Sequence, residues 1–167
     1  MIEIISRQYL EIKSIEDLAE VLPDSKKYSL NLVSPNDFQL NKFFYKQIGK
    51  KYEWKDRLDW EDKNWINYVS TKNVSTFVLK EDKDIIGYFE LIFHEEKREV
   101  EIAYLGILEE YFGKKLGGFL LGEAIKKSFQ NKIKRVWVHT CSLDHENALK
   151  NYLSRGMSVF KSETLKR

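Results

Sequence analysis

The chain has little of several features that would define its class. Its one cysteine, Cys141, excludes an intramolecular disulfide. No apolar run approaches the ~20 residues of a membrane-spanning helix, and no signal-peptide pattern opens the chain. Lys and Arg number 28 against 26 Asp and Glu, so the net charge of +2 gives no strong basic excess for nucleic acid. We expect one cytoplasmic domain without nucleic-acid or membrane partners.

A strand, a glycine-rich turn and a helix follow one another in the second half of the chain. Polar and apolar residues alternate over 99–104, as on a strand, and apolar residues recur at helical spacing over 116–129. Residues 113–118 between them contain three glycines, and Lys114 and Lys115 add positive charge. Because the first N–H groups of a helix lack intrahelical partners, this unit predicts an anion site.

The spacing of the turn fits neither of two common phosphate loops, the P-loop and the G-x-G-x-x-G turn of dinucleotide folds. It resembles the pyrophosphate loop of the GNAT N-acetyltransferase superfamily, Arg/Gln-x-x-Gly-x-Gly/Ala. Phe112 occupies the signature position where Arg or Gln is usual, and Lys115 occupies the position of the first signature Gly. Gly117 matches the final Gly/Ala position. The stretches GYFEL, VEIAYLGIL and VWVHTCSLDH are similar to one bacterial subgroup. The family's Asn…Ala…Tyr…Gly helix is matched by Asn147, Ala148, Tyr152 and Gly156.

The resemblance implies an α/β single-domain GNAT fold. Its central sheet is mixed and mostly antiparallel, has splayed fourth and fifth strands, and is flanked by helices. We assign residues 1–27 to an N-terminal arm and 28–167 to the GNAT domain. In the arm, Ser14 is expected to cap a short helix.

The pattern along the rest of the chain predicts where the elements lie. A first core strand is expected at 28–33, and Ser34 as N-cap should begin a helix that Gly49 ends. A second helix should start near Asp59 or Trp60. An antiparallel meander should follow over 76–104, then a strand at 135–141 parallel to its predecessor, a helix over 144–154 capped by Asp144, and a strand at 157–162. The side chains expected to point inward from the first two helices are Phe38, Leu40, Phe43, Phe44, Ile48, Trp65, Ile66 and Val69.

The resemblance also implies acetyl-CoA as co-substrate, and we expect no metal. The backbone near Gly106 would hold the acetyl and pantetheine groups, and the glycine-rich turn would hold the pyrophosphate. The implied coenzyme-binding residues are Leu105, Gly106, Ile107, Phe112, Gly113, Lys114, Lys115, Leu116, Gly117, Gly118, Asn147 and Tyr152.

Acetyl transfer to an amine needs a base for the amine and benefits from an acid for the leaving thiolate. Glu101 and Glu90 lie among apolar residues of two strands, where a carboxylate either reaches a cleft or meets a cation. Either is a candidate base, with a solvated residue or a salt-bridge partner as the alternative. Tyr152 matches the tyrosine that approaches the coenzyme sulfur in the family, and plain core packing is its alternative.

The run from His139 to His145 carries four side chains that could bind zinc or, through Cys141, form an acyl-enzyme. It lacks paired ligand spacing, and His139 and Cys141 are parallel neighbours on a strand, so a strand end beside the cleft is the preferred interpretation. Aromatic residues between the first two helices could line an acceptor site. Trp54, in a polar loop, and His139 are assigned to the acceptor.

These observations predict an N-acetyltransferase that moves acetyl from acetyl-CoA to an amine by direct attack. The acceptor is a small molecule or a peptide, and the protein a monomer or homodimer. A GNAT-like sensor or structural protein that binds coenzyme A without turnover is the alternative. A phosphate-binding module outside the superfamily is a third interpretation.

Overall fold

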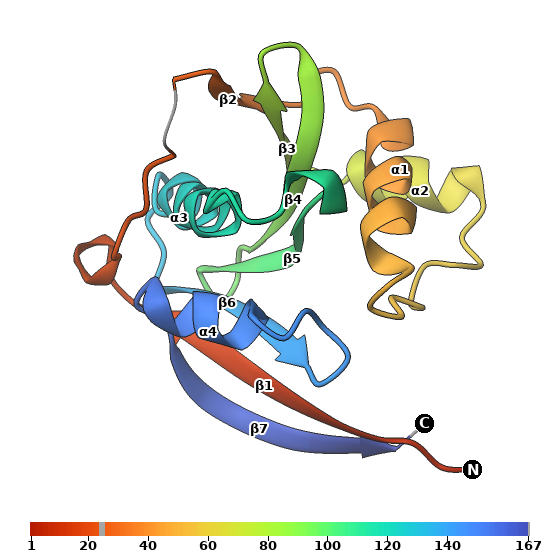
Figure 1. The fold of residues 1–167 in the computed structure, drawn as a ribbon, viewed down its shortest axis with the longest axis vertical. Helices are drawn as coiled ribbons and strands as arrows, with labels where there is room; N and C mark the ends of the chain where they lie inside the picture. Colours follow the sequence, from red (N-terminus) through yellow and green to blue (C-terminus); the bar gives the residue numbers. More distant parts are fainter. Residues whose placement is uncertain (24–25, 167) are drawn as a thin grey trace.

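The computed structural model describes residues 1–23 and 26–166, and these form one sheet flanked by helices (Figure 1). The sheet has seven strands in the order β2-β3-β4-β5-β6-β1-β7. Neighbouring strands are antiparallel except for β5 and β6, which are parallel. The predicted fold class is therefore confirmed. The strands are β1 (Ile4–Ile12), β2 (Tyr28–Leu32), β3 (Val74–Glu81), β4 (Asp84–His94), β5 (Glu99–Ile107), β6 (Arg135–Cys141) and β7 (Ser158–Lys166).

The helices divide between the two faces of the sheet. Figure 1 shows α1 and α2 on one side and α3 and α4 on the other. The apolar stripe of α3 packs on the larger core cluster, and α1 closes a second cluster with Val78 and Tyr88. No helix in the described ranges is long and apolar enough to cross a membrane. The helices are η1 (Ile15–Asp17), α1 (Phe38–Gly49), α2 (Asp62–Val69), η2 (Glu109–Tyr111), α3 (Leu116–Ser128) and α4 (Ala148–Ser154).

The two ends of the chain meet in the sheet. Strand β1, from the stretch assigned to the N-terminal arm, lies between β6 and β7 and pairs with both. Ile4 lies opposite Lys166, and Figure 1 shows both termini at the same edge of the molecule. Ser14 caps η1 as expected, accepting a hydrogen bond from the Glu16 N–H.

Three predicted helix starts were wrong by two to four residues. α1 begins after Asp37, whose carboxylate accepts from the Gln39 N–H, and not after Ser34. α2 begins after Glu61, where a reciprocal capping box with Asn64 satisfies the first backbone donors. α4 begins after Asn147, because the Asp144 side chain is bound to the preceding turn.

Three predictions of side-chain direction were also wrong. Phe43 and Ile66 are 40% and 44% exposed, because the expected apolar stripes were wider than the faces that α1 and α2 bury. In β5, the register opposite β4 passes from Tyr104 to Ile102 and skips Ala103. This irregularity breaks the strand alternation, so Tyr104 packs in the α1 cluster while Ile102 packs in the α3 cluster.

Candidate active site

The site begins where β5 and β6 separate. The two strands pair at three positions only, from Glu99 opposite Arg135 to Glu101 opposite Trp137. Beyond these, β5 continues against β4 as far as Ile107, and β6 continues against β1 as far as Cys141. A cavity of about 980 Å³ opens between the diverging ends, and Leu105, Gly106 and Ile107 of β5 line it. A Cβ on Gly106 would lie 2.9 Å from the Ile48 side chain, so a glycine is needed for the close approach of α1.

The glycine-rich turn forms one end of the cavity. Gly113 has φ +84° and Lys115, the N-cap of α3, has φ +62°, both in the left-handed region that favours glycine. This conformation gives a physical reason for a signature glycine at position 115. A Cβ on Gly113 would meet nothing within 4 Å, and one on Gly117 only the Asn151 amide at 3.8 Å. The backbone is therefore open to a ligand beside the free N–H groups of the first α3 turn.

Positive charge surrounds this end of the cavity. Lys115, Lys150 and Arg155 line it, and the Arg155 guanidinium lies against Gly118 in the first turn of α3. Lys114 is not part of the lining, and its ammonium group lies over the Tyr111 ring, 5.5 Å from the centroid. Sequence patterns gave no signal for Arg155, which α4 brings to the turn from 40 residues away. The combination of helix N-terminus, open backbone and cations fits a pyrophosphate.

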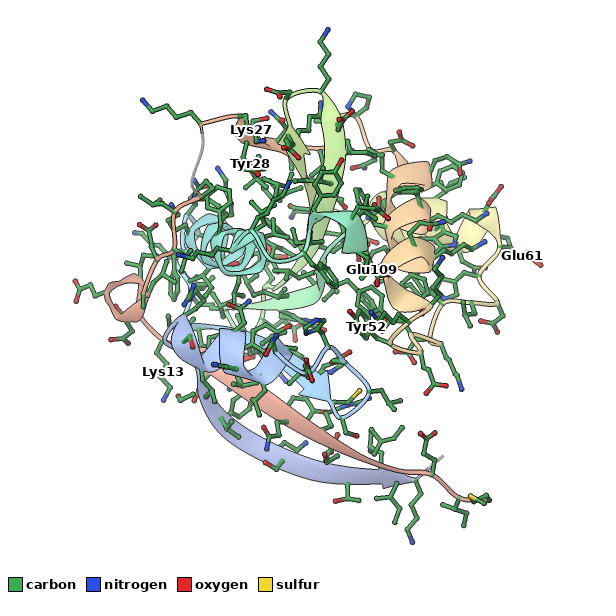
Figure 2. All side chains as sticks on the ribbon, viewed as in Figure 1. Lys13, Lys27, Tyr28, Tyr52, Glu61 and Glu109 are labelled. Atoms are coloured by element: carbon green, nitrogen blue, oxygen red, sulfur yellow. The ribbon has the colours of Figure 1, made fainter. Side chains whose placement is uncertain are left out.

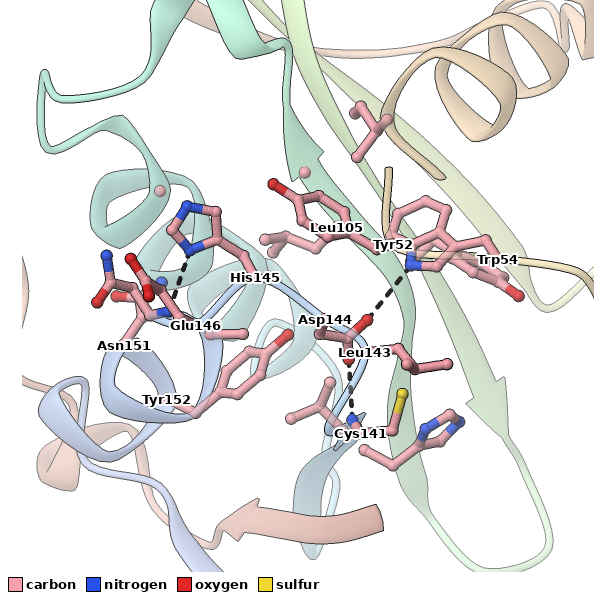
Figure 3. Close-up of a pocket in the computed structure, with 18 of the residues that line it drawn as sticks. Tyr52, Trp54, Leu105, Cys141, Leu143, Asp144, His145, Glu146, Asn151 and Tyr152 are labelled. Carbon is pink, nitrogen blue, oxygen red and sulfur yellow. Dashed lines mark hydrogen bonds between the residues drawn. The ribbon is translucent and has the colours of Figure 1, made fainter. Parts of the chain in front are cut away.

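The remaining predicted loop and helix residues also line the cavity. Phe112, at the Arg/Gln signature position, packs edge-on against the His145 ring at 5.4 Å. The Asn147 N–H donates to His145 Nδ1 at 3.0 Å. In Figure 3 the Tyr152 hydroxyl points into the cavity. Burial, with a contribution from the Asp144 carboxylate, raises the pKa of Tyr152, so this hydroxyl stays protonated at neutral pH.

The two carboxylates predicted as bases do not line the cavity. Glu90 is fully buried beneath α1 and α2 and accepts hydrogen bonds from the Tyr68 hydroxyl at 2.7 Å and the Asn41 amide at 2.8 Å. Glu101 lies 2.9 Å from His94 Nε2. The structure therefore brings neither carboxylate to the cavity. Each has side-chain partners elsewhere, Glu90 beneath α1 and α2 and Glu101 at His94.

Glu90 also binds Arg57, which is itself buried and comes from the loop between α1 and α2. The guanidinium Nη1 lies 3.0 Å from a Glu90 oxygen. Aromatic rings surround it, with Tyr68 at 4.1 Å and Tyr104 at 4.5 Å from the guanidinium carbon to the ring centroid. Burial alone would lower the pKa of Arg57, but the Glu90 carboxylate raises it overall. This buried pair ties the loop to β4.

The same loop supplies aromatic residues to the cavity. Tyr52 and Trp54 line it (Figure 3). The Trp54 ring centroid lies 4.8 Å from that of Tyr104. Figure 2 shows Tyr52 and Glu109 near the same end of α1. Trp65, by contrast, is 1% exposed and belongs to the core.

The end of β6 forms the opposite wall. His139 and Cys141 line the cavity from one face of the strand. Burial and nearby Arg7 lower the pKa of His139, which favours its neutral form. Burial raises the pKa of Cys141, which favours the unreactive thiol. In the described part of the chain, no three His, Cys, Asp or Glu side chains are grouped to hold a metal ion.

Asp144 is a cavity residue that sequence reasoning assigned to a different role. Its position before a helix suggested an N-cap, yet its carboxylate accepts from the Cys141 N–H at 2.9 Å and the Thr140 hydroxyl at 2.7 Å. The Trp54 indole N–H reaches it from across the cavity at 3.4 Å. A strand end followed within three residues by a carboxylate was the available signal.

Residues 37–157 match the model of the acetyltransferase (GNAT) family, and the chain therefore belongs to that family. This result excludes the interpretation as a phosphate-binding module outside the family. A search of curated proteins returned no match.

Solved structures share the fold at low sequence identity. A GCN5-related N-acetyltransferase from Sphaerobacter thermophilus superposes with a TM-score of 0.72 at 14% identity, over 98% of this chain and 51% of that one. A GCN5-related N-acetyltransferase from Kribbella flavida superposes with a TM-score of 0.66 at 16% identity, over 99% of this chain and 58% of that one. An aminoglycoside acetyltransferase from an uncultured soil metagenomic sample, solved with trehalose, superposes with a TM-score of 0.65 at 16% identity. The match covers 78% of this chain and 88% of that one. This chain therefore spans about half of the length of the Sphaerobacter protein and about three fifths of the length of the Kribbella protein.

Proposed function

We propose that this protein transfers an acetyl group from acetyl-CoA to an amine of a small-molecule or peptide acceptor. The observation that carries the proposal is the cavity between the diverging ends of β5 and β6. One end offers a helix N-terminus and cations, and the other offers aromatic rings and polar side chains. Membership of the acetyltransferase family supports the same chemistry.

The cavity suits coenzyme A in an extended pose. Its pyrophosphate would take the N–H groups of the first α3 turn, with Lys115 and Arg155 nearby. Its pantetheine amides would follow β5 at 105–107, where the strand edge facing the gap has no β6 partner. The thioester would then lie near the Tyr152 hydroxyl.

In the proposed reaction the amine nitrogen attacks the acetyl carbonyl carbon, the C–N bond forms and the C–S bond breaks. Tyr152 is placed to protonate the departing thiolate, because its hydroxyl points into the cavity (Figure 3) and carries a proton at neutral pH. A protein that binds coenzyme A without turnover is the second candidate. Phe112 at the signature Arg/Gln position and the left-handed Lys115 are the observations that favour it.

A thermal-shift panel of acetyl-CoA, CoA, ATP and NAD tests the coenzyme site. At 100-fold over its dissociation constant, acetyl-CoA should stabilise the fold by about 2.7 kcal/mol, or roughly 5–10 °C for a chain of this size. Gly117→Val would place a branched side chain where the phosphate lies and should abolish the shift, whereas Lys115→Ala keeps the backbone N–H and should reduce it only slightly. No shift of the wild type at millimolar acetyl-CoA would refute the proposal. Thiol release with an amine panel then separates an enzyme from a sensor.

A further inference from the structure

The carboxylates that line the cavity differ in how they are held. Glu53, Asp56 and Glu146 are exposed at its rim, whereas Asp144 is half-buried between the end of β6 and the start of α4. A group that handles a substrate proton needs a fixed orientation and shelter from bulk water. Of these four side chains, Asp144 meets both conditions.

Asp144 has one oxygen engaged and one available. Oδ2 accepts from the Thr140 hydroxyl at 2.7 Å and the Cys141 N–H at 2.9 Å, which fixes the plane of the carboxylate. Among the described residues, Oδ1 accepts a hydrogen bond only from Trp54 Nε1, at 3.4 Å. That distance is long for an N–H···O bond. Oδ1 therefore keeps capacity for a further donor.

The surroundings of this oxygen suit an amine beside a thioester. Figure 3 shows Asp144 between Trp54 and Tyr152, with the Tyr152 hydroxyl directed toward the same space. The Asp144 charge contributes to the raised pKa of Tyr152, as expected of close neighbours. The Trp54 ring, which packs against Tyr104, lies next to the carboxylate, and an aromatic surface of this kind accommodates a cation.

We propose that Asp144 receives the acceptor amine and takes its proton during transfer, an inference that rests on the acetyltransferase function proposed above. Oδ1 accepts an N–H of the amine, and this proton passes to Oδ1 as the C–N bond forms. The C–S bond breaks and the thiolate takes the proton of Tyr152. The proton on Asp144 then restores the tyrosine, so both side chains end as they began and the products are an amide and a thiol.

The competing explanation is that Asp144 only stabilises the turn after β6. Asp144→Asn separates the two, because an amide oxygen still accepts from Cys141 and Thr140 while the negative charge is lost. Asp37→Asn is the matched control. Asp37 also accepts a backbone N–H, that of Gln39 at 3.1 Å, but it caps α1 away from the cavity.

The experiment measures thiol release from acetyl-CoA by the full chain, with water and with a panel of primary amines, and CoA affinity by calorimetry. For Asp144→Asn we expect turnover to fall by about 10²-fold or more, with CoA affinity and melting temperature near those of Asp37→Asn. In Asp144→Ala, added formate should restore part of the turnover, because it can occupy the vacated carboxylate position. If Asp144 only stabilised the turn, Asp144→Ala would lose melting temperature as well, and formate would restore the melting temperature together with turnover.

Three results would overturn the proposal. Asp144→Asn with wild-type turnover would remove the carboxylate from the reaction. A parallel loss of CoA affinity and melting temperature, without formate rescue, would leave Asp144 a structural residue. A wild type that binds acetyl-CoA but releases no thiol with any acceptor would refute the acetyltransferase function itself, and the proton role with it.

Discussion

Two carboxylates of this protein, Glu90 and Asp144, differ in how completely their oxygens are partnered. Glu90 is enclosed between the sheet and the α1–α2 pair, and both of its oxygens have partners from Arg57, Asn41 and Tyr68. Asp144 lies at the gap between β5 and β6, and the only hydrogen bond to its Oδ1 from a described residue is long. A completely partnered buried carboxylate is a structural element, whereas one with remaining capacity at a cavity is available for chemistry.

The difference predicts opposite consequences for the two regions. Changes at the Glu90 cluster should alter stability and leave the chemistry of surviving folded protein intact. Changes at the gap should alter turnover or coenzyme binding and leave stability nearly intact. Mutations at three positions test this contrast.

The largest effect on stability is expected for Glu90→Gln. The substitution leaves the Arg57 guanidinium buried without its counter-charge, and breaking a buried pair in this way costs about 3–5 kcal/mol, or roughly 10 °C in melting temperature for this chain length. Calorimetry would measure it. Glu95→Gln removes a carboxylate from an exposed pair with Lys72 and should leave the melting temperature unchanged. Equal melting temperatures for the two variants would show that the buried pair contributes no more than a surface one.

Tyr152→Phe should show the opposite pattern, with a smaller change in free energy. It keeps the ring and its packing but removes the hydroxyl proton, so turnover should fall by roughly 10–10³-fold, at or below the usual range for general acids. CoA affinity and melting temperature should stay near wild type. Tyr28→Phe is the control for loss of a tyrosine hydroxyl, because Tyr28 is partly buried and lies outside the cavity. Full turnover in Tyr152→Phe would assign the tyrosine to packing alone.

The smallest effect is expected for Lys115→Gly. Lys115 holds a left-handed backbone conformation with φ +62°, which costs a residue other than glycine of order 1 kcal/mol. Glycine removes this strain but gains freedom in the unfolded chain, so the net change should be a small stabilisation with CoA affinity slightly reduced by the lost charge. Denaturant titration and calorimetry measure the two quantities. A clear destabilisation would mean that the lysine side chain, and not its backbone, determines the turn.

The sequence predicted those parts of the fold that depend on local pattern. The strand, turn and helix over 99–129 lie where they were expected, apart from the irregularity at Ala103, because their periodicity and glycines act over a few residues. Glu90 could not be located in this way, because alternation shows that a residue faces one side of a sheet but not which helix covers that side. Strand β1 could not be placed either, since its two partner strands, β6 and β7, lie near the other end of the chain.

The site shows the same limit. Gly106, Gly117 and Tyr152 were predicted as site residues because the family resemblance assigns them by position, and all three line the cavity. Asp144 was given the role of an N-cap because a carboxylate before a helix usually has that role. The turn after β6 instead directs its side chain back to Cys141, and only the folded backbone shows this direction.

Two of the ion pairs that attach the loop between α1 and α2 respond differently to salt. At one end, Arg57 and Glu90 are sealed from solvent, where dissolved ions screen charges little. At the other, Lys51 and Glu109 form a pair at 3.1 Å with more than half of each side chain exposed, and ions in the medium weaken such a pair. High ionic strength should therefore weaken the attachment of the loop to η2, beside the pyrophosphate turn, and leave the Arg57–Glu90 attachment near Tyr104 intact.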